Sequence, residues 1–307
     1  MIFEGTEKKF ELLLKPGKPS LRSLGRKFWD EVVRAAEAVV LSTVANEHCD
    51  AYLLSESSLF VYDDRAVMIT CGRTRLVGSV QRLLRRVPVE GVESFIYERK
   101  NENFPHLQPT TFEDDVAILK DLMPGVATRF GEQDGHHLSL FHLANEHHAP
   151  LDDITAEFLM YDLSPEVRAR FTDPAHARIV DRSGVRGILP GYTLDEHFFE
   201  PSGYSMNGIE GDRYHTIHVT PNESGSYASF ETNCRFTAGE MAEVLARAVR
   251  VFEPRRLDLI LFQIATGGEA AIGDFRLVDR EIRSLSCGYR VEFSHFVQTP
   301  VAGGRVS

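Results

Sequence analysis

The stretch Ala51-Tyr52-Leu53-Leu54-Ser55-Glu56-Ser57-Ser58-Leu59-Phe60-Val61-Tyr62 places a polar tetrapeptide inside an apolar run. Short runs rich in Val, Leu, Tyr and Phe are typical of strands. Similar runs lie on either side of it, at 39–45 and 66–70. Together the three runs predict adjacent antiparallel strands, with Ser57 on or beside one of them.

Helix signals surround these strands. Apolar residues at helical spacing predict one helix over 21–36 and another over 74–87, and Thr111 begins a third. The second half predicts a similar order, with strand-like 154–163, a hairpin region over 199–233, a helix opening at Thr237, and strands at 258–265 and 289–298. We therefore predict an α+β fold, in which 1–307 is one domain of two sheets with helices outside. A sheet-and-helix unit is expected in each half, with 125–150 as the loosest connection.

Composition excludes several classes of protein. The chain has 307 residues, 43% of them hydrophobic, and 45 acidic against 34 basic residues give a formal charge of −11. That sign repels phosphate backbones and anionic lipids, so we expect neither a nucleic-acid partner nor a membrane partner. No basic leader and no run of about 18 apolar residues is present, which predicts a cytoplasmic protein.

Cysteines and histidines give no metal signal. The cysteines show no CxxC spacing, which indicates neither a disulfide framework nor a structural zinc site. A histidine-rich segment matches no common ligand pattern, so we predict no metal there. These residues are Cys49, Cys71, Cys234 and Cys287, and His136, His137, His142, His147 and His148.

The tetrapeptide from Ser55 to Ser58 has two interpretations. In the structural one, its hydroxyls satisfy the backbone of a bulge or turn. In the chemical one, the Ser57 hydroxyl attacks the carbonyl carbon of Glu56, and the amide becomes an ester that a base then eliminates. The chain would break after Glu56, and a pyruvoyl group would form the new N-terminus.

A second segment supplies groups that suit this reaction. Asn207-Gly208 predicts a tight hairpin turn near Ser205, and pairing across the hairpin would bring His218 close to Ser205. A hydroxyl can stabilise the oxyanion of the attack, and an imidazole can remove the serine α-proton. Taken alone, the two residues are better explained as a turn serine and a hydrogen-bonded strand histidine.

Seven motifs in order resemble the S-adenosylmethionine decarboxylases of the eukaryotic type. The resemblance covers nearly the whole chain, and it implies a four-layer α-β-β-α sandwich of two antiparallel sheets, often paired as a homodimer of two-chain protomers. The motifs are Phe3-Glu4-Gly5-Thr6-Glu7-Lys8, Leu54-Ser55-Glu56-Ser57-Ser58, Thr70-Cys71-Gly72, Phe199-Glu200-Pro201, Gly203-Tyr204-Ser205-Met206-Asn207-Gly208, Thr216-Ile217-His218 and Ser229-Phe230-Glu231-Thr232-Asn233.

The resemblance implies a cofactor made from the chain itself. Ser57 matches the pyruvoyl precursor, so cleavage would leave a small chain 1–56 and a large chain 57–307. Ser205 and His218 match the processing pair. The family's pyruvoyl group forms a Schiff base with S-adenosylmethionine and withdraws electrons as carbon dioxide leaves. The product is the aminopropyl donor for spermidine and spermine synthesis.

The resemblance also assigns three further catalytic residues. Cys71 matches the residue that reprotonates the substrate α-carbon, a role that a thiol beside a carbanion can fill. Without the other motifs, Cys71 would be interpreted as a buried strand cysteine. Glu4 and Glu7 match active-site carboxylates, which suit a cationic sulfonium and amine.

Substrate recognition carries over with one departure. Phe3 and Phe199 match two aromatic residues that stack on adenine, and Leu54 matches an apolar contact beside it. Glu56 is a further candidate for substrate binding. The family places a glutamate four residues after the histidine to bind the ribose hydroxyls, whereas this chain has Asn222.

Two interpretations of Asn222 stay open. Either the Asn222 amide oxygen or the neighbouring Glu223 carboxylate takes over the ribose contact, or the substrate is a basic amino acid such as ornithine or arginine. A third alternative is a non-catalytic regulatory homologue, which predicts damage to the cleavage residues.

Four positions match a binding site for putrescine, the activator of animal members: Asp153, Thr155, Glu157 and Glu231. Buried carboxylates need a cation, so a diamine partner is physically reasonable. Lys9 stands where responsive relatives have an apolar residue, and Ile69 replaces a family lysine. Lys9 therefore offers a built-in cation, and stimulation by putrescine stays an open alternative.

Overall fold

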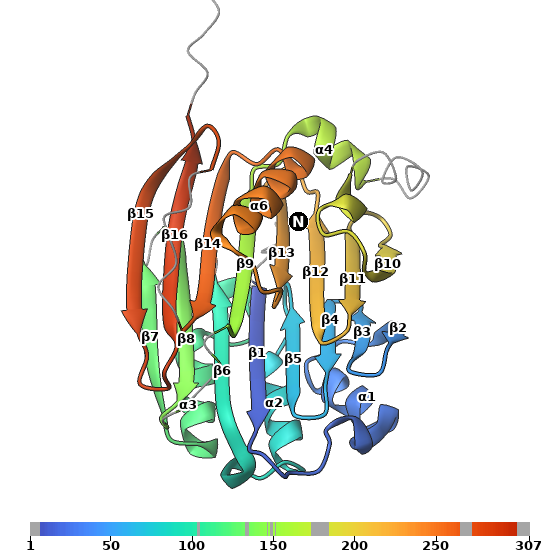
Figure 1. The fold of residues 1–307 in the computed structure, drawn as a ribbon, viewed down its shortest axis with the longest axis vertical. Coiled ribbons are helices and arrows are strands. Elements are labelled where there is room, and N and C mark those ends of the chain that lie inside the picture. Colours follow the sequence, from blue (N-terminus) through green and yellow to red (C-terminus); the bar gives the residue numbers. More distant parts are fainter. Residues whose placement is uncertain are drawn as a thin grey trace, which may run out of the picture.

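Two eight-stranded antiparallel sheets form the body of the protein (Figure 1). The structure, a computed structural model, describes residues 7–102, 105–132, 135–145, 147, 150, 152–172, 184–264 and 272–299. The first sheet has the order β2-β3-β4-β5-β1-β6-β8-β7. Its strands are β1 (Glu7–Leu14), β2 (Val40–Ala45), β3 (Asp50–Leu54), β4 (Ser57–Val61), β5 (Arg65–Thr70), β6 (Val92–Lys100), β7 (Gly125–Gly131) and β8 (His137–Leu143).

The second sheet repeats the first in strand order. It runs β10-β11-β12-β13-β9-β14-β16-β15, so each strand has an equivalent at the same place in the first sheet. The duplicated unit expected from the sequence is confirmed at the level of topology. The strands are β9 (Ile154–Tyr161), β10 (Thr193–Phe198), β11 (Tyr204–Glu210), β12 (Arg213–Thr220), β13 (Tyr227–Thr232), β14 (Arg256–Gln263), β15 (Phe275–Ser284) and β16 (Arg290–Gln298).

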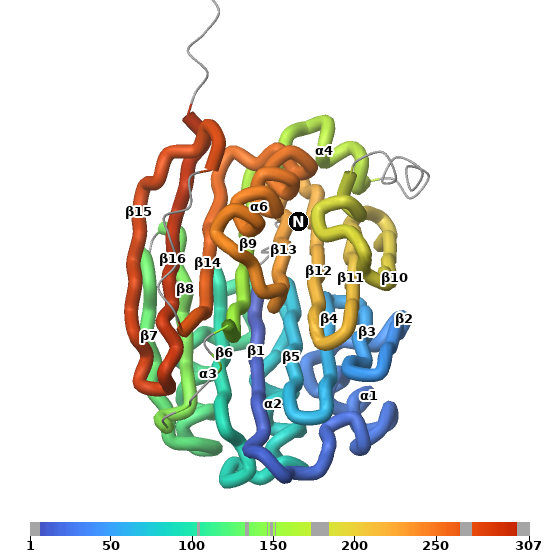
Figure 2. Tube along the Cα trace, in the orientation of Figure 1, coloured from blue at the N-terminus to red at the C-terminus, as the bar shows by residue number. Residues whose placement is uncertain are grey.

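Helices cover the outer face of each sheet and complete the four predicted layers. One apolar cluster joins the first sheet to α1 (Gly25–Ala35), α2 (Leu76–Leu84) and α3 (Phe112–Leu122), and another joins the second sheet to α4 (Pro165–Arg170) and α6 (Ala238–Phe252). Figure 2 follows this order by colour, with the first half blue to green and the second yellow-green to red. Short 3₁₀ turns lie at Arg22–Leu24, Val89–Gly91, Pro105–Leu107 and Val185–Gly187.

The sheets pack face to face with equivalent strands over each other. β3 contacts β11 and β4 contacts β12. Apolar clusters fill parts of the space between the sheets, but buried charged residues lie there too, including Lys9, Glu98 and Glu157, each at most 1% exposed. A polar interior between two sheets is costly unless its groups are paired, and this interior contains the candidate site.

Two details of the predicted strands are wrong. The run 51–62 is a hairpin of β3 and β4, because Ser55 and Glu56 form a turn and Leu54 pairs with Ser57. The region 125–150 is not a loose connection, since β7 and β8 pair within it.

No helix in the described ranges is long and apolar enough to cross a membrane.

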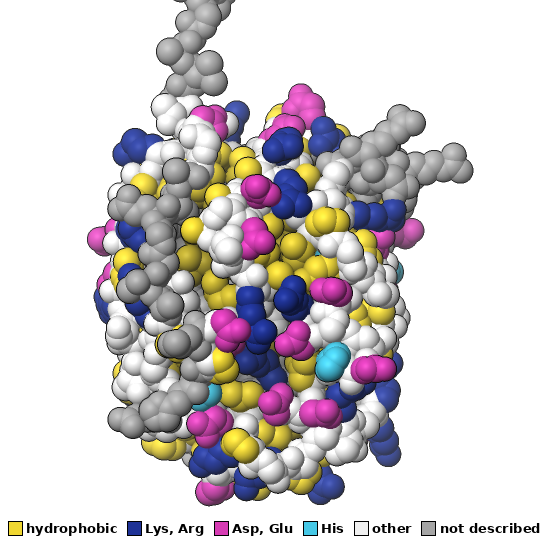
Figure 3. Space-filling view, in the orientation of Figure 1, with side chains coloured by type: hydrophobic (Ala, Val, Ile, Leu, Met, Phe, Trp, Pro, Cys, Tyr) yellow, Lys and Arg dark blue, Asp and Glu magenta, His cyan; other side chains and the backbone are white. Residues whose placement is uncertain are grey.

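The outer surface mixes both charge signs. Figure 3 shows Lys and Arg side chains gathered near the centre of one face with Asp and Glu around them. Half-exposed Arg235, for example, lies 3.1 Å from Asp152 and 3.9 Å from Asp212. Surface pairs of this kind contribute little to stability, but they show that the net charge is not spread as one uniform negative field.

Candidate active site

The polar tetrapeptide forms the turn between β3 and β4 and starts β4 under strain. The Ser55 amide donates to the Val39 carbonyl at 2.9 Å, and the Ser55 hydroxyl accepts from the Val39 amide at 3.1 Å. Ser57 has a φ of +149°. Non-glycine residues in this region cost about 1–3 kcal/mol and cluster at functional sites. One turn therefore has both features: a Ser55 hydroxyl that bonds to the backbone, as in the structural interpretation, and a strained Ser57 beside the bond that the chemical interpretation would cleave.

The strained backbone redirects the Ser57 side chain. Strict alternation would place it with Leu59 and Val61, which pack against the helices. Instead, the buried Ser57 hydroxyl lies 2.9 Å from Nε2 of His218 on the second sheet. Ser58 faces the same ring, 3.3 Å from Nε2.

His218 is held from both ends of its ring. Ser205 pairs with His218 across β11 and β12, and its hydroxyl lies 2.8 Å from Nδ1. Thr216 lies 2.8 Å from Nε2. Burial lowers the pKa of His218 to about 4, although the Glu7 carboxylate partly opposes this shift. The imidazole is therefore neutral at pH 7 and able to accept a proton.

The turn predicted at Asn207-Gly208 is wrong, because both residues lie inside β11 and the hairpin turns at Gly211 and Asp212. A Cβ on Gly208 would lie 2.2 Å from the His215 ring, so only glycine at this position leaves space for the His215 side chain. The Asn207 side-chain oxygen accepts from the Ser58 hydroxyl at 2.6 Å. The predicted approach of Ser205 and His218 still holds, through strand register.

The carbonyl that Ser57 would attack has its own donor. The Cys71 amide donates to the Glu56 carbonyl oxygen at 2.8 Å. We expected the Ser205 hydroxyl in this place, but the structure puts it on His218. A backbone N–H on the scissile carbonyl is suited to stabilise a developing oxyanion.

A cavity of about 650 Å³ opens in front of these groups. Cys71, Phe199 and Asn222 line it, and Phe199 and Asn222 come from loops outside β10 and β12. The full lining is Ser55, Glu56, Ser57, Cys71, Arg73, Leu107, Phe199, Glu200, Pro201, Ser202, Gly203, Tyr204, Ser205, His218, Val219, Thr220 and Asn222.

Three of the described residues predicted to bind substrate or to act in catalysis do not line the cavity: Glu7, Leu54 and Glu223. Leu54 is fully buried in the apolar cluster under the helices. Glu223 is exposed, so only Asn222 of that pair reaches the cavity. Phe3 and Glu4 lie outside the described residues.

The Cys71 thiol is kept protonated. Burial raises its pKa, and the Glu7 and Glu56 carboxylates raise it further. The loop that follows is fixed by Lys8, whose ammonium donates to the carbonyls of Gly72 at 2.8 Å and Thr74 at 3.0 Å. This role of Lys8 was not predicted, because a lysine between two charged residues, Glu7 and Lys9, indicates a solvated strand end.

Glu7 lies close enough to His218 to act on the pKa of its ring, and its carboxylate forms a buried ion pair with Lys100. Burial alone would raise its pKa, but the Lys100 ammonium at 2.8 Å holds the pKa below its usual value. The Tyr227 hydroxyl also donates to Glu7, at 3.3 Å. Lys100 lies 2.6 Å from Glu157 as well, so it joins the site to a buried acidic cluster. Lys100 was not predicted either.

The buried acidic cluster contains two of the four predicted putrescine positions. The Lys9 ammonium lies 2.6 Å from Glu157, 3.2 Å from Glu231 and 3.5 Å from Glu98. Burial raises the pKa of Glu231 to about 7, and burial with repulsion from Glu157 raises that of Glu98 to about 8. Lys9 therefore sits where a buried cation is needed.

The other two putrescine positions lie apart from these contacts. Asp153 accepts from Tyr289 at 2.6 Å and lies 3.5 Å from Arg65. Thr155 is buried on β9, opposite Phe262 of β14.

We predicted no metal in the histidine-rich segment. One of its residues, His136, lies close to Asp258 and His295, and side chains of these types can bind a metal ion. His136 and His295 lie 2.8 Å and 2.6 Å from Asp258, and Arg256 lies 3.0 Å from the other nitrogen of His136. These are hydrogen-bond distances, and a guanidinium beside the group disfavours a second cation.

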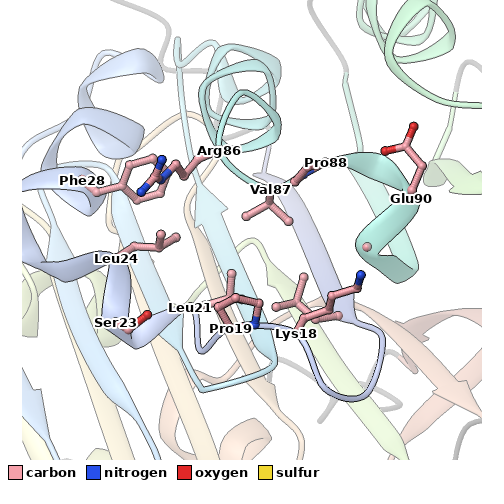
Figure 4. Close-up of a pocket in the computed structure, with 12 residues that line it drawn as sticks. Lys18, Pro19, Leu21, Ser23, Leu24, Phe28, Arg86, Val87, Pro88 and Glu90 are labelled. Carbon is pink, nitrogen blue, oxygen red and sulfur yellow. The ribbon is translucent and has the colours of Figure 1, made fainter.

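A second cavity, of about 490 Å³, lies away from this chemistry (Figure 4). Leu21, Leu24, Phe28 and Val87 contribute apolar groups to its lining, and Lys18 is among the charged residues that also line it. It opens on the helix side of the first sheet, whereas Ser57 faces the second sheet. No predicted site residue lines it.

Comparison with known proteins agrees with this geometry. A family described as adenosylmethionine decarboxylase matches residues 1–297. The chain is 34% identical to an S-adenosylmethionine decarboxylase proenzyme of Xenopus laevis over 97% of this chain and 96% of that protein. For the proenzyme of Dictyostelium discoideum the identity is 31%, over 96% and 86%.

A solved structure is similar as well. It is a Trypanosoma brucei AdoMetDC-delta26 monomer, with a TM-score of 0.60 and 25% identity over 78% of this chain and 99% of that one. The chain belongs to the adenosylmethionine decarboxylase family.

Proposed function

We propose that the protein is a self-processing S-adenosylmethionine decarboxylase whose pyruvoyl group derives from Ser57. The observation that carries this proposal is the 2.9 Å approach of the Ser57 hydroxyl to His218 Nε2, beside a cavity large enough for a small-molecule substrate. A nucleophile, a neutral base and a donor on the scissile carbonyl are the groups that the cleavage requires, so the residues fit the pyruvoyl group.

In processing, the Ser57 oxygen bonds to the Glu56 carbonyl carbon while His218 takes the hydroxyl proton. The C–N bond then breaks, the Ser57 nitrogen gains a proton, and an ester links the two residues. His218 next removes the Ser57 α-proton, and the Glu56 carboxylate leaves. Loss of ammonia from residue 57, with uptake of water, produces the keto group.

In turnover, the pyruvoyl carbonyl supplies an electron sink for the substrate's α-carbon. Phe199 offers a ring face for adenine, and Asn222 offers an amide oxygen or N–H to the ribose hydroxyls. Glu56 and Glu7 place negative charge near the cationic sulfonium and amine. The Cys71 thiol, protonated at neutral pH, returns a proton to the substrate α-carbon.

Release of carbon dioxide from S-adenosylmethionine, ornithine and arginine, measured in parallel, tests the substrate. We expect release from S-adenosylmethionine, because a flat cavity wall at Phe199 suits an adenine ring. Release only from ornithine or arginine would move the function to a basic amino acid decarboxylase. A chain that stays uncleaved and releases carbon dioxide from none of the three would support the remaining alternative, a non-catalytic regulatory homologue.

Replacing Cys71 with alanine is expected to spare cleavage and slow turnover by about 10²-fold, the usual effect of losing an acid catalyst. The amide of residue 71 still donates to the Glu56 carbonyl, so processing keeps its donor. Fragment yield and carbon dioxide release measure the two effects separately. Cys49→Ala, which removes a buried thiol just before β3, is the control, and equal losses in both variants would contradict the role of Cys71.

We propose that Lys9 replaces an activating diamine. Its ammonium already pairs with Glu157 and Glu231, and both of these acids are buried, at most 2% exposed. Lys9→Leu is expected to lower basal activity several-fold and to make it responsive to putrescine, because removing one partner leaves buried charges unpaired. Steady-state rates with and without putrescine check this, with Lys9→Arg as the control. Strong stimulation of the unmodified protein would contradict it.

The resemblance further supports a homodimer of two-chain protomers in the cytoplasm. Mass measurement in solution and fractionation of the source cells would check these two predictions.

A further inference from the structure

The cavity holds an unbalanced set of charges. Glu56 and Glu200 are its acidic lining residues, and His218 is neutral because burial lowers its pKa to about 4. Among the lining residues that the structure describes, Arg73 has the single permanent positive charge. The substrate classes considered above all combine cationic groups with an α-carboxylate. Glu56 and Glu200 suit the cationic groups of the substrate, so Arg73 is the lining residue whose charge suits the substrate carboxylate.

Arg73 lies in a segment whose backbone is fixed, and its side chain is exposed. Lys8 binds the carbonyls on both sides of it, those of Gly72 and Thr74, and the Thr74 hydroxyl donates to Thr70 at 2.9 Å. No hydrogen bond or ion pair joins the exposed Arg73 side chain to any residue in the described ranges. The backbone is anchored, and the charged end is available to a ligand.

We infer that Arg73 binds the α-carboxylate of the amino-acid substrate and thereby selects substrates that have this group. The segment places it two residues after Cys71, and Arg73, Cys71 and Ser57 all line the same cavity. Guanidinium and carboxylate form charge-assisted, often bidentate hydrogen bonds. The inference rests on the proposed decarboxylase function, but it does not depend on which amino acid is used.

The chemistry predicts where this contact acts. When the bond between the α-carbon and the carboxyl carbon breaks, its electron pair stays on the α-carbon and carbon dioxide leaves uncharged. The ion pair with Arg73 is therefore strongest in the bound substrate and weakens toward the transition state. Such a contact lowers KM without raising kcat, and it also favours release of a product that has no carboxylate.

Arg73→Met is expected to raise KM about tenfold, the size of one charge-assisted hydrogen bond, with kcat unchanged or higher. Because Arg73 is exposed, KM of the unmodified enzyme is expected to rise with salt more steeply than that of the variant. Arg73→Lys should restore part of the affinity. Arg75→Met, an exposed arginine two residues away that does not line the cavity, is the matched control and should keep the original KM.

A binding experiment gives a second readout that needs no turnover. In the uncleaved Ser57→Ala chain, titration calorimetry is expected to show that Arg73→Met weakens S-adenosylmethionine binding about tenfold, again the effect of one charged contact, and leaves 5′-methylthioadenosine, which has no carboxylate, unchanged.

Equal weakening of both ligands, or an unchanged KM, would overturn the inference. If the unmodified enzyme releases carbon dioxide only from ornithine or arginine, the proposed substrate is wrong. The Arg73 test is then repeated in turnover with that amino acid, so the two failures are distinguishable.

Discussion

Replacing Ser57 with alanine is expected to leave a single uncleaved chain without decarboxylase activity. The methyl group has no oxygen to attack the Glu56 carbonyl, so no ester forms and no elimination can produce the pyruvoyl group. Both processing and turnover are therefore lost. Denaturing electrophoresis with intact mass should show fragments matching 1–56 and 57–307 in the unmodified protein, the second with a blocked N-terminus. The variant should show one band that persists on long incubation.

Ser58→Ala is the matched control for this experiment. Ser58 is also buried and its hydroxyl also approaches His218, at 3.3 Å, but the carbonyl before it belongs to Ser57. We expect the Ser58 variant to be cleaved after Glu56. A Ser57→Ala protein that is cleaved or fully active would contradict the assignment of the cofactor.

Replacing His218 with alanine is expected to slow cleavage by about 10²–10⁴-fold, the range for loss of a general base. Chains that reach the ester without the base stay there, because the Ser57 α-proton is no longer removed. Hydroxylamine cleaves esters but not ordinary amides, so it should release fragment 1–56 from the stalled variant. Time courses of fragment mass, with and without hydroxylamine, measure both effects.

The pH dependence of cleavage follows from the same ring. Burial lowers the pKa of His218 to about 4, so the imidazole is neutral above that pH and protonated below it. Only the neutral form accepts a proton. The cleavage rate should stay level between about pH 5 and 8 and fall near pH 4, rather than near the usual histidine value of about 6.5.

His215→Ala is the control for His218. His215 is a buried histidine of the same strand, but its ring lies over Gly208 and near Tyr192 rather than near Ser57. Normal cleavage in the His215 variant and slow cleavage in the His218 variant would assign the effect to the base. Equal slowing in both would indicate a structural effect and contradict the proposed role.

The sequence predicted those parts of the fold that depend on neighbours in the chain. Thr111 and Thr237 begin helices through capping boxes that involve only the next few residues, and both are present. The hairpin at Ser55 and Glu56 was missed because neither residue is a usual two-residue turn former. Gly208 was misinterpreted because the reason for it, the His215 ring, lies on the paired strand.

The site shows the same division. Motifs predicted Ser57, Ser205 and His218 as site residues, yet the distance from Ser57 to His218 depends on how two sheets stack, which no local pattern determines. Lys8 and Lys100 were missed because lysine ordinarily indicates a solvated position. Their burial depends on partners that lie tens of residues away in the chain, such as Gly72 and Glu157.

The central place of β1 has a consequence for the proposed two-chain form. β1 belongs to the small chain, but it pairs with both β5 and β6, which belong to the large chain. Cleavage therefore leaves the sheet intact while it turns unfolding into dissociation of two molecules. The unfolding midpoint of the processed protein depends on its concentration, whereas that of the uncleaved chain does not. Refolding after cleavage then requires the two chains to meet, so the order of events, folding first and cutting second, becomes irreversible in practice.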